Sequence, residues 1–342
     1  MKKEITIVLL CLCIVCSVFG QSKEVTDYVD MGVVLHDKGD YNAAIEQYKS
    51  ALKIDSKSPL VNYEIANTYF ALKDYQKAIE HIDVVLAAKS DYIDKAYTLK
   101  GSALDLSGKS SEAIKMFEEA IKQYPHNYLL YYNMGLAFYN IEKDNDAAAA
   151  MQKALKVNPK HASSHLLLAY IMREQNSRVK SLLAIYNFLL LEPKGKRAQS
   201  GYNLLESQLK KGVTRRDEKS IDITLKESDA GDEFSAAELM LSLLEASKSL
   251  EENKSKTEYE LFADNTKSFF TVLGELKKGN KDFWWNYYVD FFASMTKNKH
   301  VEAFSYYISQ SKDDNKIKVW LDTNKEKVDA LLQWYANYKR KY

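Results

Sequence analysis

Few side chains in this sequence have the type and spacing that chemistry at a metal or a substrate requires. His161 and His165 are four residues apart, which is the spacing of a metal-binding pair on one face of a helix. No Glu lies within that motif, so we expect no metal there. Paired carboxylates such as Glu118 and Glu119 lie among lysines and are typical of a solvated helix surface. The sequence also has no serine nucleophile elbow and no glycine loop for phosphate, and therefore predicts neither an enzyme nor a cofactor.

The cysteines occur only near the start of the chain. Cys11, Cys13 and Cys16 lie within an apolar run, residues 5–19, which follows Lys2 and Lys3 and ends near small residues. This order predicts a signal peptide over residues 1–20, cleaved near Gly20, because a run of 15 residues is shorter than the roughly 20 that span a membrane. We therefore expect a periplasmic or secreted protein, with an outer-membrane-associated alternative. No transmembrane segment is expected after cleavage, and disulfides and thiolate metal ligands are excluded.

Composition narrows the class of protein further. The chain has 342 residues, 46% of them apolar and 28% charged, with only 12 Gly and 4 Pro, which predicts a folded and mainly helical protein. The 48 basic and 47 acidic residues are interspersed along the chain. Nucleic acid is therefore not an expected partner, because phosphate binding needs positive charge gathered on one face.

Small residues recur between residues 25 and 194 with a period close to 34. Those that precede the apolar end of each predicted second helix are Ala44, Ala78, Ala113, Ala147 and Ser181, spaced 34, 35, 34 and 34 apart. Twelve residues before each lies a second small residue, namely Gly32, Ala66, Gly101, Gly135 and Ala169. Four residues after each lies a large apolar one, namely Tyr48, Ile82, Phe117, Met151 and Ile185. Since small residues let two helix backbones approach while large ones interlock, the pattern predicts antiparallel helix pairs.

This pattern resembles the tetratricopeptide repeat. The resemblance covers five repeats, approximately residues 25–58, 59–92, 94–127, 128–161 and 162–195. It implies an all-α fold in which helix pairs stack into a right-handed superhelix, each burying its apolar face only against its neighbours. Lys100 departs from the pattern, because the other repeats have Met, Ile or Leu at that position. We expect its aliphatic stem to lie along the core with the ammonium group in solvent.

The resemblance also implies a concave groove lined by the first helix of each repeat. The residues expected there are Tyr63, Asn67, Phe70, Ser102, Asp105, Tyr132, Leu136, Tyr139, Tyr170 and Arg173. Family members that clamp a terminal carboxylate use Lys and Asn in the first repeat, where this chain has Val29 and Val33, so that partner is disfavoured. The aromatic residues suit a peptide helix or an extended segment instead. The alternative is that some of them only pack against the next repeat.

The repeat period stops after Pro193. Residues 195–212 form one more predicted helix, which we expect to cap the solenoid, and residues 213–234 form a charged linker. Ile221 and Ile223 alternate with polar residues, but a single strand would have no partner, so the linker interpretation is favoured. Residues 235–342 form a small helical domain, in which Thr323 and Glu326 predict a capping box for the last helix.

Aromatic residues are densest between Phe283 and Phe292. On a helix they cover an arc of about 200°, which predicts a central helix with neighbours on two sides. The functional alternative is an exposed ligand platform made by Trp284, Trp285 and Tyr287. The sequence thus favours a non-catalytic scaffold of the bacterial cell envelope that binds a protein or peptide in the groove. The alternative function is a carbohydrate-binding or small-ligand-binding accessory protein that uses the aromatic platform.

Overall fold

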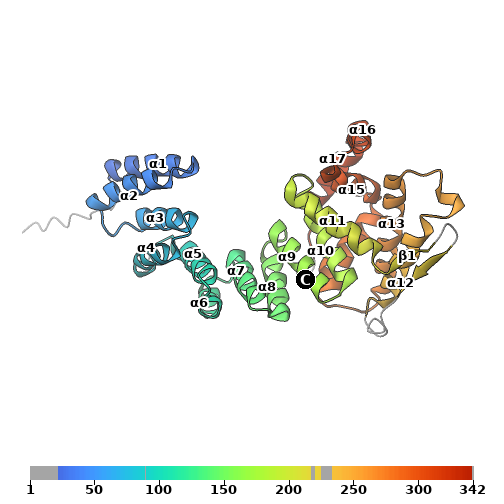
Figure 1. Ribbon diagram of the computed structural model, residues 1–342, viewed down its shortest axis with the longest axis horizontal. Coiled ribbons are helices and arrows are strands. Elements are labelled where there is room, and N and C mark those ends of the chain that lie inside the picture. Colours follow the sequence, from blue (N-terminus) through green and yellow to red (C-terminus); the bar gives the residue numbers. More distant parts are fainter. Residues whose placement is uncertain (1–21, 89, 217–219, 225–232, 341–342) are drawn as a thin grey trace, which may run out of the picture. The chain divides into compact units, whose positions relative to one another are not determined.

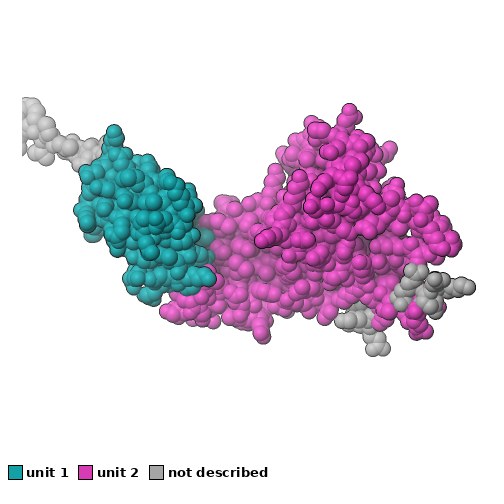
Figure 2. Space-filling model, turned by 45° about the horizontal axis from the view of Figure 1, so that its top comes forward, with its two compact units in different colours: residues 1–103 teal, residues 104–342 magenta. Residues whose placement is uncertain are grey.

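The computed structural model describes residues 22–88, 90–216, 220–224 and 233–340, so the predicted signal peptide lies outside the described residues. The chain divides into two compact units, residues 1–103 and 104–342, shown in two colours in Figure 2. The division falls inside helix α5 (Ile93–Leu106). Apart from one hairpin, the regular structure of the described part is helical, which confirms the all-α prediction (Figure 1).

The first unit contains two complete helix pairs and most of α5. Its other helices are α1 (Lys23–Asp37), α2 (Tyr41–Ile54), α3 (Pro59–Ala71) and α4 (Tyr75–Ala87). Side-chain caps begin them: the Asp40 carboxylate accepts a bond from the Ala43 N–H at 3.3 Å, and Asp74 accepts one from Lys77 at 3.2 Å. Lys100 extends its ammonium group to Asp83, with 2.6 Å between Nζ and Oδ1, as expected for a stem that reaches out of the core.

The small residues lie where two helices of a pair approach each other. A Cβ atom added to Gly32 would overlap the Tyr48 ring, and one added to Gly135 would overlap the end of Met151. Each repeat also turns between its two helices through a residue with positive φ. These residues are Gly39, Lys73, Gly108, Glu142 and Asn176, spaced 34, 35, 34 and 34 apart. The positive-φ turns therefore repeat with the same period as the small residues of the sequence.

The second unit continues the helix pairs and adds the C-terminal helices. Its α-helices are α6 (Ser110–Gln123), α7 (Tyr128–Asn140), α8 (Asp144–Val157), α9 (Ala162–Glu174), α10 (Arg178–Leu191), α11 (Lys196–Lys210), α12 (Ser235–Ser247), α13 (Glu258–Leu276), α14 (Asp290–Lys297), α15 (Val301–Ile308), α16 (Asn315–Thr323) and α17 (Lys325–Asn337). Shorter helical segments are η2 (Glu251–Asn253), the π-helix η3 (Trp284–Val289) and η4 (Ser309–Lys312).

A two-stranded hairpin lies in the segment predicted as a linker. Strands β1 (Val213–Arg215) and β2 (Ile221–Ile223) pair antiparallel, with Thr214 opposite Asp222. The linker interpretation was wrong for these residues, because the partner strand lies in the same short segment. Gly212, at φ +74°, precedes β1, and its carbonyl accepts a bond from the Thr224 N–H.

Helix α10 is the centre of the second unit. Every residue from Arg178 to Leu190 is buried except Lys180. Helices α11, α12 and α15 and the π-helix η3 pack around it, and Figure 1 shows the C-terminal helices gathered about α10 and α11. One apolar core runs from Ala147 to Leu331. The last repeats and the C-terminal helices therefore form one compact unit. The domain boundary predicted near residue 194 does not separate two compact units.

Two predictions about single helices that follow the repeats have different outcomes. Helix α11 occupies the predicted capping segment and packs on α10, but it is itself covered, since Ser309 donates a hydrogen bond to the Tyr202 hydroxyl at 3.1 Å. The capping box predicted at Thr323 is wrong, because Thr323 ends α16 and no side chain caps α17. The capping box is found at Thr257, at the start of α13.

Candidate functional site

Helices α7 and α9 of the second unit both carry partly exposed side chains, among them three at corresponding positions of each helix. Helix α9 buries Ser164, His165, Leu167, Leu168, Ala169, Ile171 and Met172, so that Leu166, Tyr170 and Arg173 remain half-buried. On α7 the corresponding half-buried residues are Tyr132, Leu136 and Tyr139. We call these six residues the α7–α9 face. Five of them belong to the predicted groove set, and Leu166 stands at an equivalent position.

The two helices are connected at both ends of the face. At one end the rings of Tyr132 and His161 meet edge to face, with centroids 4.7 Å apart. At the other end the Tyr139 hydroxyl donates a hydrogen bond to Glu174 Oε1 at 2.9 Å. Burial raises the pKa of both phenols, and the Glu174 charge adds to the effect at Tyr139. Both tyrosines are therefore neutral hydrogen-bonding groups at ordinary pH.

Arg173 is held in place by its neighbours. Its Nη2 donates to Glu174 Oε1 at 3.0 Å, and its guanidinium carbon lies 5.1 Å from the centre of the Tyr170 ring. The structure thus brings Tyr139, Tyr170 and Arg173 together in one cluster around Glu174. Sequence reasoning missed Glu174; the only available signal was a carboxylate next to Arg173 on the same predicted helix.

Asp105 already has partners within the second unit. It accepts hydrogen bonds from Ser110 Oγ at 2.6 Å and from Asn140 Nδ2 at 2.9 Å. Its carboxylate therefore joins the end of α5 to the start of α6 and the end of α7. This is a structural role that the predicted groove position did not anticipate.

The other predicted groove residues belong to the first unit. Tyr63 packs against Tyr92, with ring centroids 5.5 Å apart, and Phe70 packs edge to face against Tyr75, also at 5.5 Å. Ser102 turns its hydroxyl back to the Thr98 carbonyl at 2.9 Å, while Asn67 is half-buried. The alternative that some groove residues serve packing thus has support at Tyr63, Phe70 and Ser102.

The predicted aromatic platform is buried. Trp284 is 6% exposed, and Trp285 and Tyr287 are 0% exposed. The Trp285 ring stacks on Phe234 at 4.5 Å, and its indole N–H donates to Glu233 at 2.6 Å. The hypothesis of an exposed ligand platform was therefore wrong. The segment Trp284–Val289 contacts α10, α13 and α14, as expected for a helix with neighbours on two sides. The π-helical turn over Trp284–Val289 alters the register that an α-helical wheel assumes.

His165 is engaged through both ring nitrogens. Nδ1 lies 2.7 Å from the Tyr288 hydroxyl and Nε2 lies 3.0 Å from the Pro159 carbonyl. Burial, reinforced by the charge of Arg340, lowers the pKa of His165 to about 3. The neutral ring therefore has no lone pair left for a metal ion. Across the described ranges, no group of three or more His, Cys, Asp or Glu side chains is arranged to hold one.

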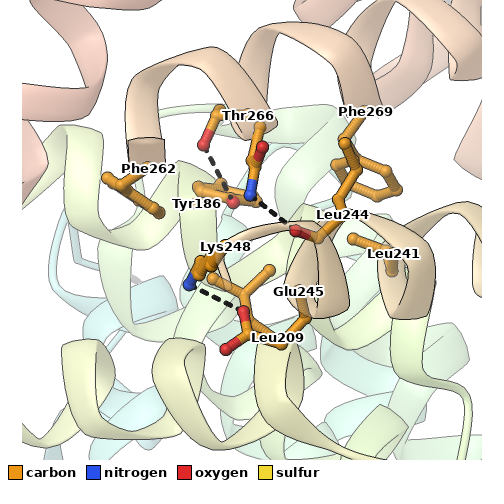
Figure 3. A pocket seen from close by; sticks show the side chains of 10 residues that line it. Tyr186, Leu209, Leu241, Leu244, Glu245, Lys248, Phe262, Thr266 and Phe269 are labelled. Atoms are coloured by element: carbon orange, nitrogen blue, oxygen red, sulfur yellow. Dashed lines mark hydrogen bonds and ion pairs between the residues drawn. The ribbon is translucent and has the colours of Figure 1, made fainter. Parts of the chain in front are cut away.

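One small pocket lies between α10, α12 and α13 (Figure 3). Its volume is about 20 Å³, room for roughly one water molecule. Figure 3 shows the Tyr186 hydroxyl turned to Thr266, at 3.4 Å, and Lys248 turned to Glu245, at 2.7 Å. With its polar groups paired and its walls formed by Phe262, Phe269 and leucines, this pocket is a packing gap and not a ligand site.

A chain of antiparallel helix pairs, with a small residue at each close approach and a positive-φ turn in each pair, is a helical repeat solenoid. Comparison with protein families identifies the repeat. Residues 32–73 match a model described as "TPR repeat", and residues 60–91, 98–150 and 132–187 match models described as "Tetratricopeptide repeat". The chain contains tetratricopeptide repeats, and this confirms the resemblance seen in the sequence.

Similar proteins share the repeats over part of their length. The TPR repeat-containing protein MJ1428 of Methanocaldococcus jannaschii is 24% identical over 203 residues, which cover 52% of this chain and 35% of that protein. The small glutamine-rich tetratricopeptide repeat-containing protein 2 of Mycosarcoma maydis is 33% identical over 92 residues, 27% of this chain and 26% of that protein. The chain thus spans about a third or less of the length of these relatives.

Among solved structures, a thermophilic TPR protein of Thermus thermophilus, TTC0263, is similar with a TM-score of 0.45 and 20% identity. The match covers 54% of this chain and 98% of that one. In the part of the chain that the structure describes, no helix has the length and hydropathy needed to cross a membrane.

Proposed function

We propose that this protein is a non-catalytic scaffold that binds a protein or peptide segment on the α7–α9 face. The observation that carries the proposal is the composition of the face, whose half-buried positions hold Tyr, Leu and Arg. Exposed positions of the adjacent helix α8 include Asn145, Asp146, Lys153 and Lys156, which is the usual make-up of a solvated helix. A partly exposed row of aromatic and apolar side chains is typical of an interaction surface.

The side chains of the face suit recognition of a peptide. A Tyr ring offers apolar contact area and a polar hydroxyl while losing little conformational entropy on binding, and Tyr and Arg dominate the energetics of many interfaces. Tyr132 and Tyr170 lie on different helices, so a segment laid across both would contact two successive repeats. The carbohydrate-binding alternative has no support from the buried residues Trp284, Trp285 and Tyr287.

A peptide selection tests this proposal. Peptides from a randomised library are selected on the protein without its predicted signal peptide, and their Kd values are measured by fluorescence anisotropy. The double variant Tyr132→Ala with Tyr170→Ala should bind the selected peptides at least about tenfold more weakly, since it removes two large contact residues. Helicity should be retained, because both residues are half-buried at the surface.

Tyr131→Ala is the matched control. Tyr131 lies on the same helix α7 and is also half-buried, but it points about 100° around the axis from Tyr132. Its replacement should change the Kd by less than about twofold. The proposal is contradicted when the double variant binds like the wild type, or when the control loses as much affinity as the double variant.

We also propose that the protein acts in the bacterial cell envelope, as a periplasmic or secreted chain. The support is the order of a basic start, an apolar run over residues 5–19 and small residues near Gly20. Sequencing the N-terminus of protein recovered from the periplasm or medium of an expressing bacterium should give a chain that begins at Gln21. An uncleaved chain confined to the cytoplasm would contradict the proposed location.

A further inference from the structure

Glu174 lies at the end of α9 and contacts residues of two repeats. Its Oε1 accepts a hydrogen bond from the Tyr139 hydroxyl at 2.9 Å and another from Arg173 Nη2 at 3.0 Å. Tyr139 comes from α7, 35 residues earlier, so the carboxylate joins two neighbouring first helices. Both donors belong to the α7–α9 face, whereas Glu174 itself is outside it.

The contact is part of a chain of bonds along the C-terminal ends of these helices. Asn140, next to Tyr139, donates to Asp105 at the end of α5, also 35 residues earlier. The end of α7 is therefore tied to α5 through Asn140 and to α9 through Tyr139.

Arg173 remains available although it is oriented. About 41% of its side chain is exposed, against 37% for Glu174. An arginine carries five N–H donors. The Glu174 contact uses one of these donors, and the Tyr170 contact uses only the flat face of the guanidinium group. The remaining donors can bond to acceptors on a bound segment, with less entropy lost because the guanidinium is already placed.

We propose that Glu174 is a positioning residue of the α7–α9 face: its Oε1 holds Tyr139 and Arg173 in the orientation in which the bound segment meets them. This inference rests on the proposed function. It assigns to Glu174 a role as a hydrogen-bond acceptor, not as a charge that touches the partner. An amide oxygen at the same place can accept the same two bonds, whereas a methyl group cannot.

The test compares Glu174→Ala with Glu174→Gln, using a peptide selected on the wild-type face. Glu174→Ala should raise the Kd about fivefold, because Tyr139 and Arg173 both lose the partner that orients them, and contacts between exposed groups contribute little each. Glu174→Gln should restore the Kd to within about twofold of the wild type. Both variants should melt at the same temperature as the wild type, measured by circular dichroism. A loss of affinity in Glu174→Ala would then reflect positioning and not a general loss of stability.

Tyr139→Phe provides an internal check. It removes the hydroxyl and keeps the ring, so Glu174→Ala should cost less affinity in the Tyr139→Phe background than in the wild type. The inference is overturned when Glu174→Ala binds like the wild type, or when Glu174→Gln is as weak as Glu174→Ala, since the charge would then act directly on the partner. When no peptide distinguishes the wild type from the Tyr132→Ala, Tyr170→Ala variant, the proposed function fails and this inference fails with it.

Discussion

His165 shows what spacing alone can indicate about a residue. Its separation from His161 is that of a metal pair, and the missing Glu argued against a metal. Its partner, the Tyr288 hydroxyl at 2.7 Å, lies 123 residues further along the chain. No local pattern connects these residues, because the contact exists only once the C-terminal helices pack on the last repeat.

The burial of His165 predicts a pH dependence of stability. Its pKa is about 3 in the folded protein, against 6.5 for a free side chain. As the pH falls below 6.5, the unfolded chain binds a proton at this position and the folded protein does not. The free energy of unfolding should therefore fall with decreasing pH, by at most about 1.4 kcal/mol per pH unit from this residue, until the pH approaches about 3.

Urea unfolding of the wild type and of His165→Gln at about pH 7.5, 6 and 5 checks this. At the highest pH the variant should be less stable, because it loses a buried hydrogen-bonded ring. On going to the lowest pH, however, it should lose less stability than the wild type. Parallel pH dependences for the two proteins would show that His165 titrates as it does in the unfolded chain.

At the level of helices and strands, the sequence predicted the helix pairs of the five repeats. The 34-residue period located these pairs, because helices that pack closely need a small residue facing a large one at a fixed spacing. The β1–β2 hairpin was missed because charged residues surround a short alternation. The π-helix η3 was missed because a run of aromatic residues at helical spacing does not distinguish an α-helix from a π-helix. The same spacing also does not indicate whether the rings are buried or exposed.

The start of α13 gives a prediction at this scale. The Thr257 hydroxyl accepts a bond from the Glu260 N–H, and Glu260 bonds back to the Thr257 N–H at 2.8 Å. Thr257→Ala should lower the free energy of unfolding by about 1 kcal/mol, measured by urea denaturation. Thr323→Ala is the control: it lies at the exposed end of α16 and should change stability by less than about 0.5 kcal/mol. Equal losses would contradict the placement of the capping box.

At the scale of the whole molecule, the division of the chain differs from the one that the sequence suggested. The end of the repeat period at Pro193 indicated a boundary, yet the apolar core of the second unit continues from α8 to α17. Three contacts account for this: Tyr287 with the Leu155 carbonyl, His165 with Tyr288, and Arg340 with Asn187. They join residues 132, 123 and 153 positions apart, which a single sequence cannot pair.

Because the apolar core is continuous, we predict that the last repeats are unstable without the C-terminal helices. A fragment of residues 22–212 would expose α10, whose Tyr186 is packed against Phe270, Phe292 and Phe304 in the whole protein. We expect the fragment to bind the dye ANS strongly and to melt at least about 10 °C below the full chain, without a sharp transition. A fragment that melts like the full chain and does not bind ANS would contradict the shared core.

The exposure of the α7–α9 face was predictable in part. Tyr132, Leu136, Tyr139, Tyr170 and Arg173 are half-buried, as groove positions of the repeat should be, because helical period and repeat register determine which side of a helix is left open. Glu174 was missed because its hydrogen bond comes from a hydroxyl in the preceding repeat, which no local pattern indicates. The alternative of an exposed platform at Trp284, Trp285 and Tyr287 was wrong. The sequence alone left it open because burial depends on contacts with helices that lie far away in the chain.

Photo-crosslinking from position 170 can show whether a peptide binds on the α7–α9 face. p-Azidophenylalanine replaces Tyr170 on the face in one variant and Tyr335, on α17, in another, and each is irradiated with a selected peptide. We expect a peptide adduct from position 170 that excess unlabelled peptide suppresses, and none from position 335. An adduct formed from position 335 and not from position 170 would contradict binding on the α7–α9 face.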